Sequence, residues 1–268
     1  MHDTMLLVAA VSYLLAAALL YRELLEESGK GPRWSVALTL LGAACHAAAQ
    51  STHWIGPAPS PSFFNVMSLC ALVVVALLLL SLLTPRRLFD AGLVALPLTT
   101  FMLLIEWSVP APGNLLGDAG PAIGAHVVSS VMAFGFLSLA GVYAFFVALI
   151  DHFLRRHHLN RLVQALPALD VMESLLFSLI KVGFALLTLS LATGLIYVDD
   201  LLAQHLAHKT VLSFVAWLLF GVLLWGRRFR GWRGRTAVRL TIAGVILLIL
   251  SYFGSKWVLE VLLGRHWG

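Results

Sequence analysis

The chain has 268 residues, of which 60% are hydrophobic and only 12% are charged. A soluble domain is about half apolar and about a quarter charged, so the composition excludes an ordinary soluble protein. The net charge of +5 could suggest nucleic-acid binding, but the basic residues stand at the ends of apolar runs, where they serve as topology signals. We therefore predict an all-α, polytopic integral membrane protein that binds membrane lipid and no nucleic acid.

Eight apolar stretches have about the 20 residues that a membrane-spanning helix needs. They predict a single transmembrane domain over residues 1–268, built as a bundle of about eight helices. The predicted spans lie near 5–22, 34–55, 63–83, 91–108, 122–150, 171–198, 210–226 and 237–263. The fifth span is longer than the hydrocarbon core is thick, so its helix must tilt or project beyond the bilayer.

Lysine and arginine are unevenly distributed among the connections between these spans. The first, third, fifth and seventh connections are basic, whereas 56–62 and 109–121 contain no Lys or Arg, and 199–209 contains only Lys209. Because basic loops stay in the cytoplasm, this pattern places both termini outside.

Cys45 and Cys70 each stand alone in an apolar run, and the chain contains neither C-x-x-C nor C-x-x-C-H. A thiol–disulfide relay and a c-type cytochrome are therefore not expected. The sequence also has no P-loop, nucleophile elbow or H-E-x-x-H motif. We expect no enzyme in which side chains carry out bond-making catalysis.

His126 stands near the outer end of the fifth span. The residues that share its helical face have mostly small side chains, and those on the opposite face have large ones. The two faces are His126, Ser129, Ser130, Ala133, Leu137, Ala140, Gly141 and Ala144, against Val128, Met132, Phe136, Leu139, Tyr143 and Phe146. Because small residues suit helix packing and large ones suit lipid, His126 should point into the protein and the large face should meet lipid.

The second span carries a stripe of small and polar residues along one face. The stripe consists of Thr39, Gly42, Ala43, His46, Ala49, Gln50 and His53. An ionisable residue inside a membrane is a candidate for a functional site. A histidine there can also serve only to hold neighbouring helices together by hydrogen bonds. For His46 alone the two interpretations are balanced. His126, at a similar depth on another helix, favours a shared site.

A haem is the cofactor that best suits two such histidines. A structural zinc site needs four ligands, often sulfur, whereas haem needs one or two axial histidines and an apolar slot. We therefore predict haem b with its iron bound by His126 and His46, and His53 as a weaker candidate. His152, His157 and His158 stand among arginines and are expected to be solvated or to face lipid headgroups, and His2 is expected at a frayed terminus. The six other histidines fall on the predicted outer half.

Two lysines within the spans need an explanation. Lys181 could pair with a carboxylate, extend its ammonium group to the membrane surface or meet a haem propionate. Lys256 could pair with Glu260, four residues away, or meet a propionate. We favour pairing or surface extension for both, and keep propionate binding as the alternative.

Several stretches, in order along the chain, resemble the cytochrome c assembly family of CcsA, CcmC and CcmF, and most of all its eight-span YpjD- and HemX-like members. They cover about residues 122–260. They are Ala125-His126-Val127, LLTLSLATG over 186–194, KTVLSFVAW over 209–217, GWRGR over 231–235 and SYFGSK over 251–256. The N-terminal half matches more loosely, through Cys45-His46-Ala47 and Phe64-Asn65-Val66.

This resemblance implies an inner-membrane protein that holds haem near the outer surface between two histidines. His126 matches the first of them, and His266 is a loose match for the second. The haem exporters of the family carry the pattern W-G-x-x-W-x-W-D-P-K between these histidines, whereas residues 199–209 of this chain keep only the lysine, Lys209. The loss of this tryptophan pattern affects the expected delivery of haem more than the expected binding of haem.

Three functions therefore stay open. The first is a haem-binding protein of haem handling or cytochrome c-type biogenesis, with a cytochrome assembly component as a candidate partner. The second is a regulatory or partner subunit of another membrane protein that delivers no haem. The third is a transporter of a small solute or ion, with Lys181, Glu106 and the polar stripe of the second span along its path.

Overall fold

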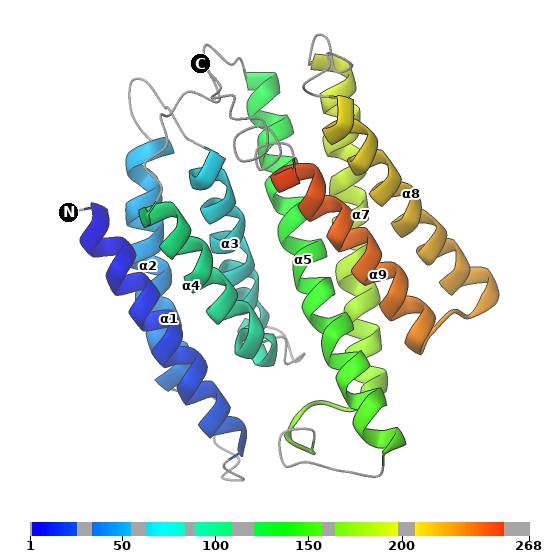
Figure 1. Cartoon of the computed structure of the whole chain (residues 1–268), viewed down its shortest axis with the longest axis horizontal. Helices are drawn as coiled ribbons and strands as arrows, with labels where there is room; N and C mark the ends of the chain where they lie inside the picture. The colour runs from blue at the N-terminus through cyan, green and yellow to red at the C-terminus, as the bar shows by residue number, and fades with distance from the viewer. Residues whose placement is uncertain are drawn as a thin grey trace. The chain divides into compact units, whose positions relative to one another are not determined.

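The structure, a computed structural model, describes residues 2–25, 34–54, 63–83, 89–108, 121–156, 164–197 and 207–254. Within these ranges the chain is helical and has no strand (Figure 1). The α-helices are α1 (His2–Leu25), α2 (Trp34–Trp54), α3 (Phe63–Leu80), α4 (Gly92–Ser108), α5 (Pro121–Arg155), α7 (Leu169–Tyr197), α8 (Ala207–Arg230) and α9 (Gly234–Ile249). Three short segments complete them: η1 (Ser81–Leu83), η2 (Phe89–Ala91) and the π-helical η3 (Leu250–Gly254).

Each stretch predicted as a span overlaps one of these α-helices, several of which extend beyond the predicted limits. Within the described ranges, seven helices are long and apolar enough to cross a membrane, and α2 is not among them. α2 has 21 residues, but its polar side chains lower its mean hydropathy. The all-α, multi-pass membrane class is thus confirmed, and the crossing by α2 stays a prediction.

Contacts between α-carbons group the chain into two compact units. Unit 1 comprises Met1–Ala119 and Ile150–Leu175, and unit 2 comprises Gly120–Leu149 and Leu176–Gly268. The boundary passes through α5 and α7, so each of these helices contributes to both units. A single transmembrane domain stays a prediction.

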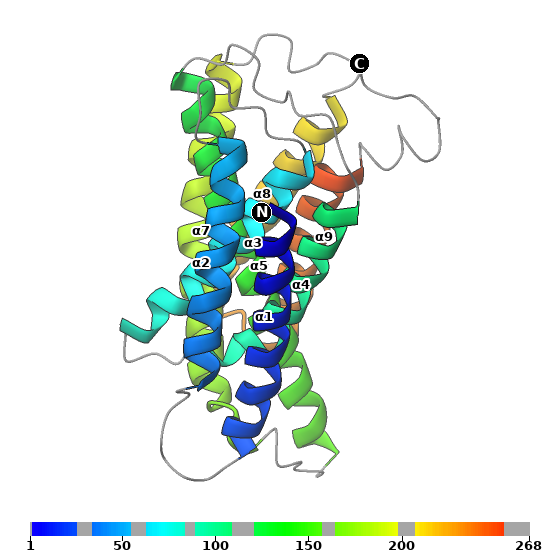
Figure 2. The same cartoon turned by 90° about the vertical axis from the view of Figure 1, so that its left-hand side faces the viewer.

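In unit 1, helices α1 to α4 lie side by side (Figures 1 and 2). α1 packs against α2 and α4, and α3 packs against the same two helices. The buried face of α1 includes small residues such as Ala9 and Ala16. At Gly42 of α2, a Cβ would lie 2.7 Å from Cε1 of Tyr13. Small residues at these positions let α1 and α2 approach closely.

In unit 2, glycines mark the places where helices meet. A Cβ at Gly183 of α7 would lie 2.6 Å from Cγ of Leu137 on α5. Likewise, a Cβ at Gly244 of α9 would lie 2.7 Å from Cζ of Phe220 on α8. Neither position has room for a larger residue unless the partner moves, so the contacts depend on glycine.

The large face of α5 differs from its prediction. Val128 is exposed, as expected of a residue that meets lipid, but Leu139, Tyr143 and Phe146 are fully buried. The prediction for these three residues was wrong, because large side chains fill the spaces between helices as readily as they cover a lipid-facing surface. The face that carries His126 and mostly small residues is buried as predicted, and Leu137, the leucine on that face, is buried as well.

α5 is also long, as the sequence predicts. Its 35 residues correspond to about 52 Å of helix, against about 30 Å of hydrocarbon. At its C-terminal end, Arg155 forms an ion pair with Asp151, with Nε 3.0 Å from the carboxylate. This charged last turn is suited to the region beyond the hydrocarbon.

Candidate functional site

His126 lies in the second turn of α5, and α7 determines the direction of its ring. Nδ1 is 2.9 Å from the backbone carbonyl oxygen of Ser190, and Oγ1 of Thr193 is 3.4 Å from the same nitrogen. A carbonyl oxygen can only accept a hydrogen bond, so Nδ1 carries the proton. In the neutral ring, Nε2 then holds the free lone pair, which is the form that binds a metal.

The polar groups around His126 are hydrogen-bonded without using Nε2. Ser130 donates its hydroxyl to the backbone carbonyl of His126 at 2.6 Å, and its oxygen is also 2.6 Å from Oγ of Ser190. Ser129 donates to the carbonyl of Ala125 at 2.8 Å. Among the described residues, none forms a hydrogen bond with Nε2 of His126. This nitrogen is therefore available to a ligand from outside those residues.

Gly194 of α7 lies against the ring of His126. A Cβ at Gly194 would lie 3.1 Å from Cε1 of His126, so the ring occupies space that a larger residue would take. His126 itself is half-buried. Val128 lies two residues after His126 on α5 and is exposed. On α7, Leu195 and Ile196 directly follow Gly194 and are also exposed. A half-buried histidine with one ring nitrogen available suits the role of an axial haem ligand.

His46, in unit 1, has a different environment. Its side chain is 0% exposed, and both ring nitrogens have hydroxyl partners. Nε2 is 2.9 Å from Oγ of Ser68 on α3, and Nδ1 is 3.3 Å from Oη of Tyr13 on α1. The ring therefore links three helices by hydrogen bonds, as expected of a histidine that stabilises helix packing. Binding of iron would require His46 to give up one of these hydroxyl groups.

The remaining predicted site residues are divided between the two units or lie outside the described ranges. His46 and His53 belong to unit 1, and His126 and Lys181 to unit 2, so the shared His126–His46 site stays a prediction. Lys181 is exposed and has no ion pair within the described parts of the chain, as expected of a lysine that extends to the membrane surface. His266 and Lys256 lie outside the described residues, as does Glu260.

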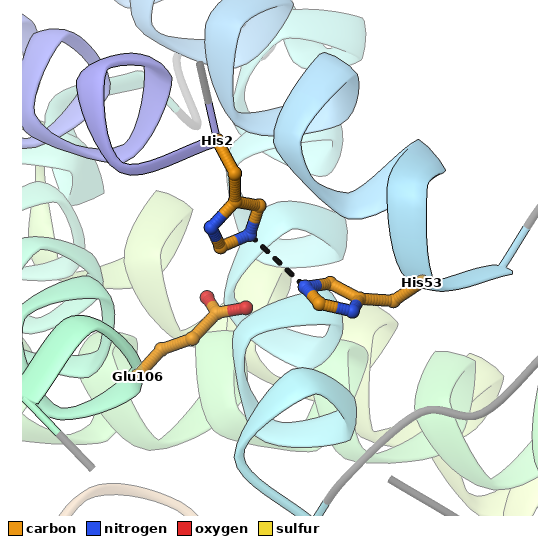
Figure 3. Close-up of side chains that lie close together, drawn as sticks. All are labelled: His2, His53 and Glu106. Atoms are coloured by element: carbon orange, nitrogen blue, oxygen red, sulfur yellow. Dashed lines mark hydrogen bonds between the residues drawn. The ribbon is translucent and has the colours of Figure 1, made fainter. Parts of the chain in front are cut away.

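The sequence analysis missed one residue cluster in unit 1. His2 was expected at a frayed terminus, but it begins α1 and its Nε2 lies 3.0 Å from Nε2 of His53. Glu106 lies beside them, at the end of α4 (Figure 3). The predicted topology would have indicated this cluster, because it assigns the start of the first span and the ends of the second and fourth to the same side of the membrane.

Comparisons with known proteins match nearly the whole chain. The family model described as "Cytochrome C assembly protein" matches residues 58–263. The "Inner membrane protein YpjD" of Escherichia coli (strain K12) is 31% identical over 260 residues, which cover 96% of this chain and 98% of that protein. An "Uncharacterized 28.8 kDa protein in nifR3-like 5'region" of Azospirillum brasilense is 31% identical over 230 residues, covering 85% of this chain and 81% of that protein.

A shorter match is to "Cytochrome c biogenesis protein CcsA" of Prochlorococcus marinus (strain MIT 9303). It is 29% identical over 87 residues, which cover 32% of this chain and 27% of that protein. No solved structure matches the chain. Because the family model covers well over half of the chain, and YpjD is similar over nearly its full length, the chain belongs to the cytochrome c assembly protein family.

Proposed function

We propose that this protein binds haem b near the outer face of a bacterial inner membrane, with Nε2 of His126 as an axial ligand. We further propose that it acts in haem handling for cytochrome c-type biogenesis. The observation that carries the proposal is the hydrogen bond from His126 to the Ser190 carbonyl, which orients the ring and leaves Nε2 available. The iron would supply any redox chemistry, and the chain would supply ligands and shielding.

The relatives support the biological setting. CcsA is named a cytochrome c biogenesis protein, and YpjD is named an inner membrane protein. The basic connections support an orientation with both termini outside, which would put His126 near the outer surface. A cytochrome assembly component is then the natural partner for a protein that handles haem there.

Three histidines are candidates for the second axial ligand. His266 matches the second histidine of the family loosely, and His46 would have to exchange its Ser68 partner for iron. His53 is a weaker candidate, since its ring already contacts His2. Lys181 and Lys256 are the candidate partners of the haem propionates, because an ammonium group pairs with a carboxylate.

The test is the absorbance spectrum of the purified full-length protein after haem is added. We expect a Soret band that is lost or shifted in His126→Ala, with a further effect when His46→Ala is added. The matched control is His152→Ala, which removes an exposed histidine from the other end of α5 and should leave the band unchanged. A spectrum that stays the same with both His126 and His46 replaced would overturn this ligand assignment.

One observation favours a second candidate function. Residues 199–209 contain no tryptophan, whereas the haem exporters of the family carry three in the matching pattern. A regulatory or partner subunit that binds haem without delivering it would not need them. That function predicts stable co-purification with another membrane protein and normal cytochrome c maturation after deletion of the gene. A clear maturation defect would instead support the delivery role.

A further inference from the structure

Three potential metal ligands meet at one end of unit 1. His2 begins α1, His53 lies in the last turn of α2, and Glu106 lies near the end of α4. One ligand atom from each residue lies within 4.8 Å of the other two. Figure 3 shows the two imidazole rings and the carboxylate directed toward one another from three different helices. The residues are far apart in sequence, so the packing of α1, α2 and α4 creates the cluster.

Glu106 is buried and held in place by neutral groups. Its side chain is only 8% exposed. Asn65 donates its amide to Oε1 at 2.7 Å, and Gln50 donates to Oε1 at 3.1 Å and to Oε2 at 3.3 Å. Both oxygens therefore act as acceptors, which is the role of an ionised carboxylate.

The charge of this carboxylate has no counterpart in the described part of the chain. The ion pair of an arginine found there, Arg155 with Asp151, does not involve Glu106, and the contact of His2 with Asp3 is an ion pair only if His2 is protonated. A buried charge inside a membrane protein is costly unless a charge of opposite sign lies close to it. A cation bound between Glu106 and the two histidines would supply that charge.

The two histidines are placed as ligands of one ion. Their Nε2 atoms are 3.0 Å apart, and the ring planes are at 84° to each other. Two imidazole nitrogens that bind one tetrahedral zinc ion at about 2.0–2.1 Å are separated by about 3.3 Å. An ion between them would need the two nitrogens to move apart by a few tenths of an ångström. The proton shared in this hydrogen bond would have to leave, since metal binding to histidine releases protons.

A neighbouring carboxylate also favours the ligand form of His2. Nδ1 of His2 is 3.3 Å from Oδ1 of Asp3. A proton on Nδ1 is donated to this carboxylate, and the Nε2 lone pair of His2 is then directed toward His53. A histidine that donates one nitrogen to a carboxylate and binds a metal with the other is a common arrangement in metalloproteins.

We propose that His2, His53 and Glu106 bind one divalent transition-metal ion of the zinc type, with a fourth position open to water or another ligand. Two histidines and one carboxylate form a ligand set that such ions accept. Gln50 and Asn65 act as positioning residues for Glu106, and Asp3 for His2. The site lies within unit 1 and does not use His126, so it does not depend on the proposed haem function.

The test uses the full-length protein in detergent, without a polyhistidine tag and after treatment with a chelator. Co²⁺ serves as the probe, because it occupies sites of the zinc type and its visible absorption bands report the coordination geometry. We expect one equivalent of Co²⁺ to bind. His53→Gln and Glu106→Gln should each weaken binding by about tenfold or more. The control His152→Gln removes an exposed histidine at the end of α5 and should bind Co²⁺ as the unaltered protein does.

A third variant, His2→Gln, distinguishes loss of a metal ligand from loss of the folded structure. His2 is the first residue of α1 and is only half-buried, so His2→Gln should leave the helix packing intact while it weakens Co²⁺ binding. Circular dichroism of each variant verifies the helical content. No saturable Co²⁺ binding in the unaltered protein would overturn the proposal. Equal affinity in the unaltered protein and in all three ligand variants would do so as well.

Discussion

His126 donates its Nδ1 proton to the backbone carbonyl of Ser190 across 2.9 Å, so a residue of α5 has its ring oriented by α7. The acceptor is a backbone atom, and for this reason a side-chain substitution at Ser190 does not remove it. Displacing the ring requires a change in what α7 presents to it. The proposed role of His126 can therefore be tested through its neighbours as well as by its removal.

Gly194 of α7 is the neighbour that most directly limits the His126 ring. A Cβ at this position would lie 3.1 Å from Cε1 and 3.3 Å from Nδ1 of His126. Gly194→Val should force the ring away from the Ser190 carbonyl. We expect haem affinity to fall by about tenfold or more, the usual range when a supporting contact of a metal ligand is lost. Titration of the purified protein with haem, followed at the Soret band, measures the change.

The control for this prediction is Gly124→Val, on α5 two residues before His126. A Cβ at Gly124 would meet nothing within 4 Å. Haem affinity should therefore stay the same in this variant. Equal losses in both variants would show that the effect comes from the loss of glycine itself and not from the His126 ring.

Imidazole in solution should rescue a protein that lacks the His126 ring. In His126→Gly, the space beside Gly194 is open to a free imidazole, which can provide the same nitrogen ligand. We expect the Soret band of haem that elutes with the protein to be lost in His126→Gly and to return when imidazole is added. A failure of imidazole to restore protein-bound haem, in a variant with normal helical content, would argue against ligation by His126.

His46 should contribute to stability whether or not haem is bound. Its removal would leave the hydroxyl groups of Tyr13 and Ser68 without their partner in a buried place. Such a loss costs about 1–3 kcal/mol for each buried polar group left unsatisfied. We expect His46→Ala to lower the midpoint of thermal unfolding of the haem-free protein.

A double-mutant cycle with Tyr13→Phe identifies the cause of that destabilisation. If the ring links the helices through the Tyr13 hydroxyl, the effects of His46→Ala and Tyr13→Phe on the free energy of unfolding should not be additive. An unchanged unfolding midpoint in haem-free His46→Ala would contradict the packing role, and would leave iron ligation as the remaining function of this residue.

The helices and the inward direction of His126 could be predicted because their signals are local. Apolar runs predict spans, and helical periodicity places His126 on the small face of the fifth span. Its partner at Ser190 could not be predicted, since the two residues are 64 positions apart and meet only when α5 packs on α7. The same reasoning applies to His46, whose partner Ser68 lies on a different helix.

Two errors in the sequence analysis have physical causes. His2 was expected to be frayed because a terminus usually is, but its ring finds a partner at His53, which no local pattern indicates. Tyr143 was expected to face lipid because it is large. It is buried, and its ring packs against that of Phe146 at a centroid distance of 6.4 Å. Residue size alone does not separate lipid from a neighbouring helix.

The turn between α8 and α9 should be sensitive to the residue at position 231. Gly231 has a φ of +65°, in the left-handed region. The turn is closed by the backbone N–H of Trp232, which donates to the carbonyl of Gly226 at 3.2 Å. We expect Gly231→Ala to destabilise the protein by about 1 kcal/mol, because a Cβ disfavours this conformation.

Gly231→Asn is the matched variant for the turn, because asparagine tolerates the left-handed region better than alanine. Thermal unfolding of the purified protein should rank the three forms as glycine, then asparagine, then alanine. A Cβ at Gly231 would meet nothing within 4 Å, so a steric clash would not explain this order. Equal stability of the alanine and asparagine variants would contradict the backbone argument.

The orientation of His126 relative to the membrane can be measured with single cysteines. Cys45 is half-buried and Cys70 is buried, and both can be replaced by alanine to give a background without thiols. Gly124→Cys then places a thiol at an exposed position two residues before His126, and His152→Cys places one at the other end of α5. A membrane-impermeant maleimide should label position 124 in intact spheroplasts, and position 152 only after permeabilisation. The reverse pattern would place His126 on the cytoplasmic side and contradict haem binding at the outer face.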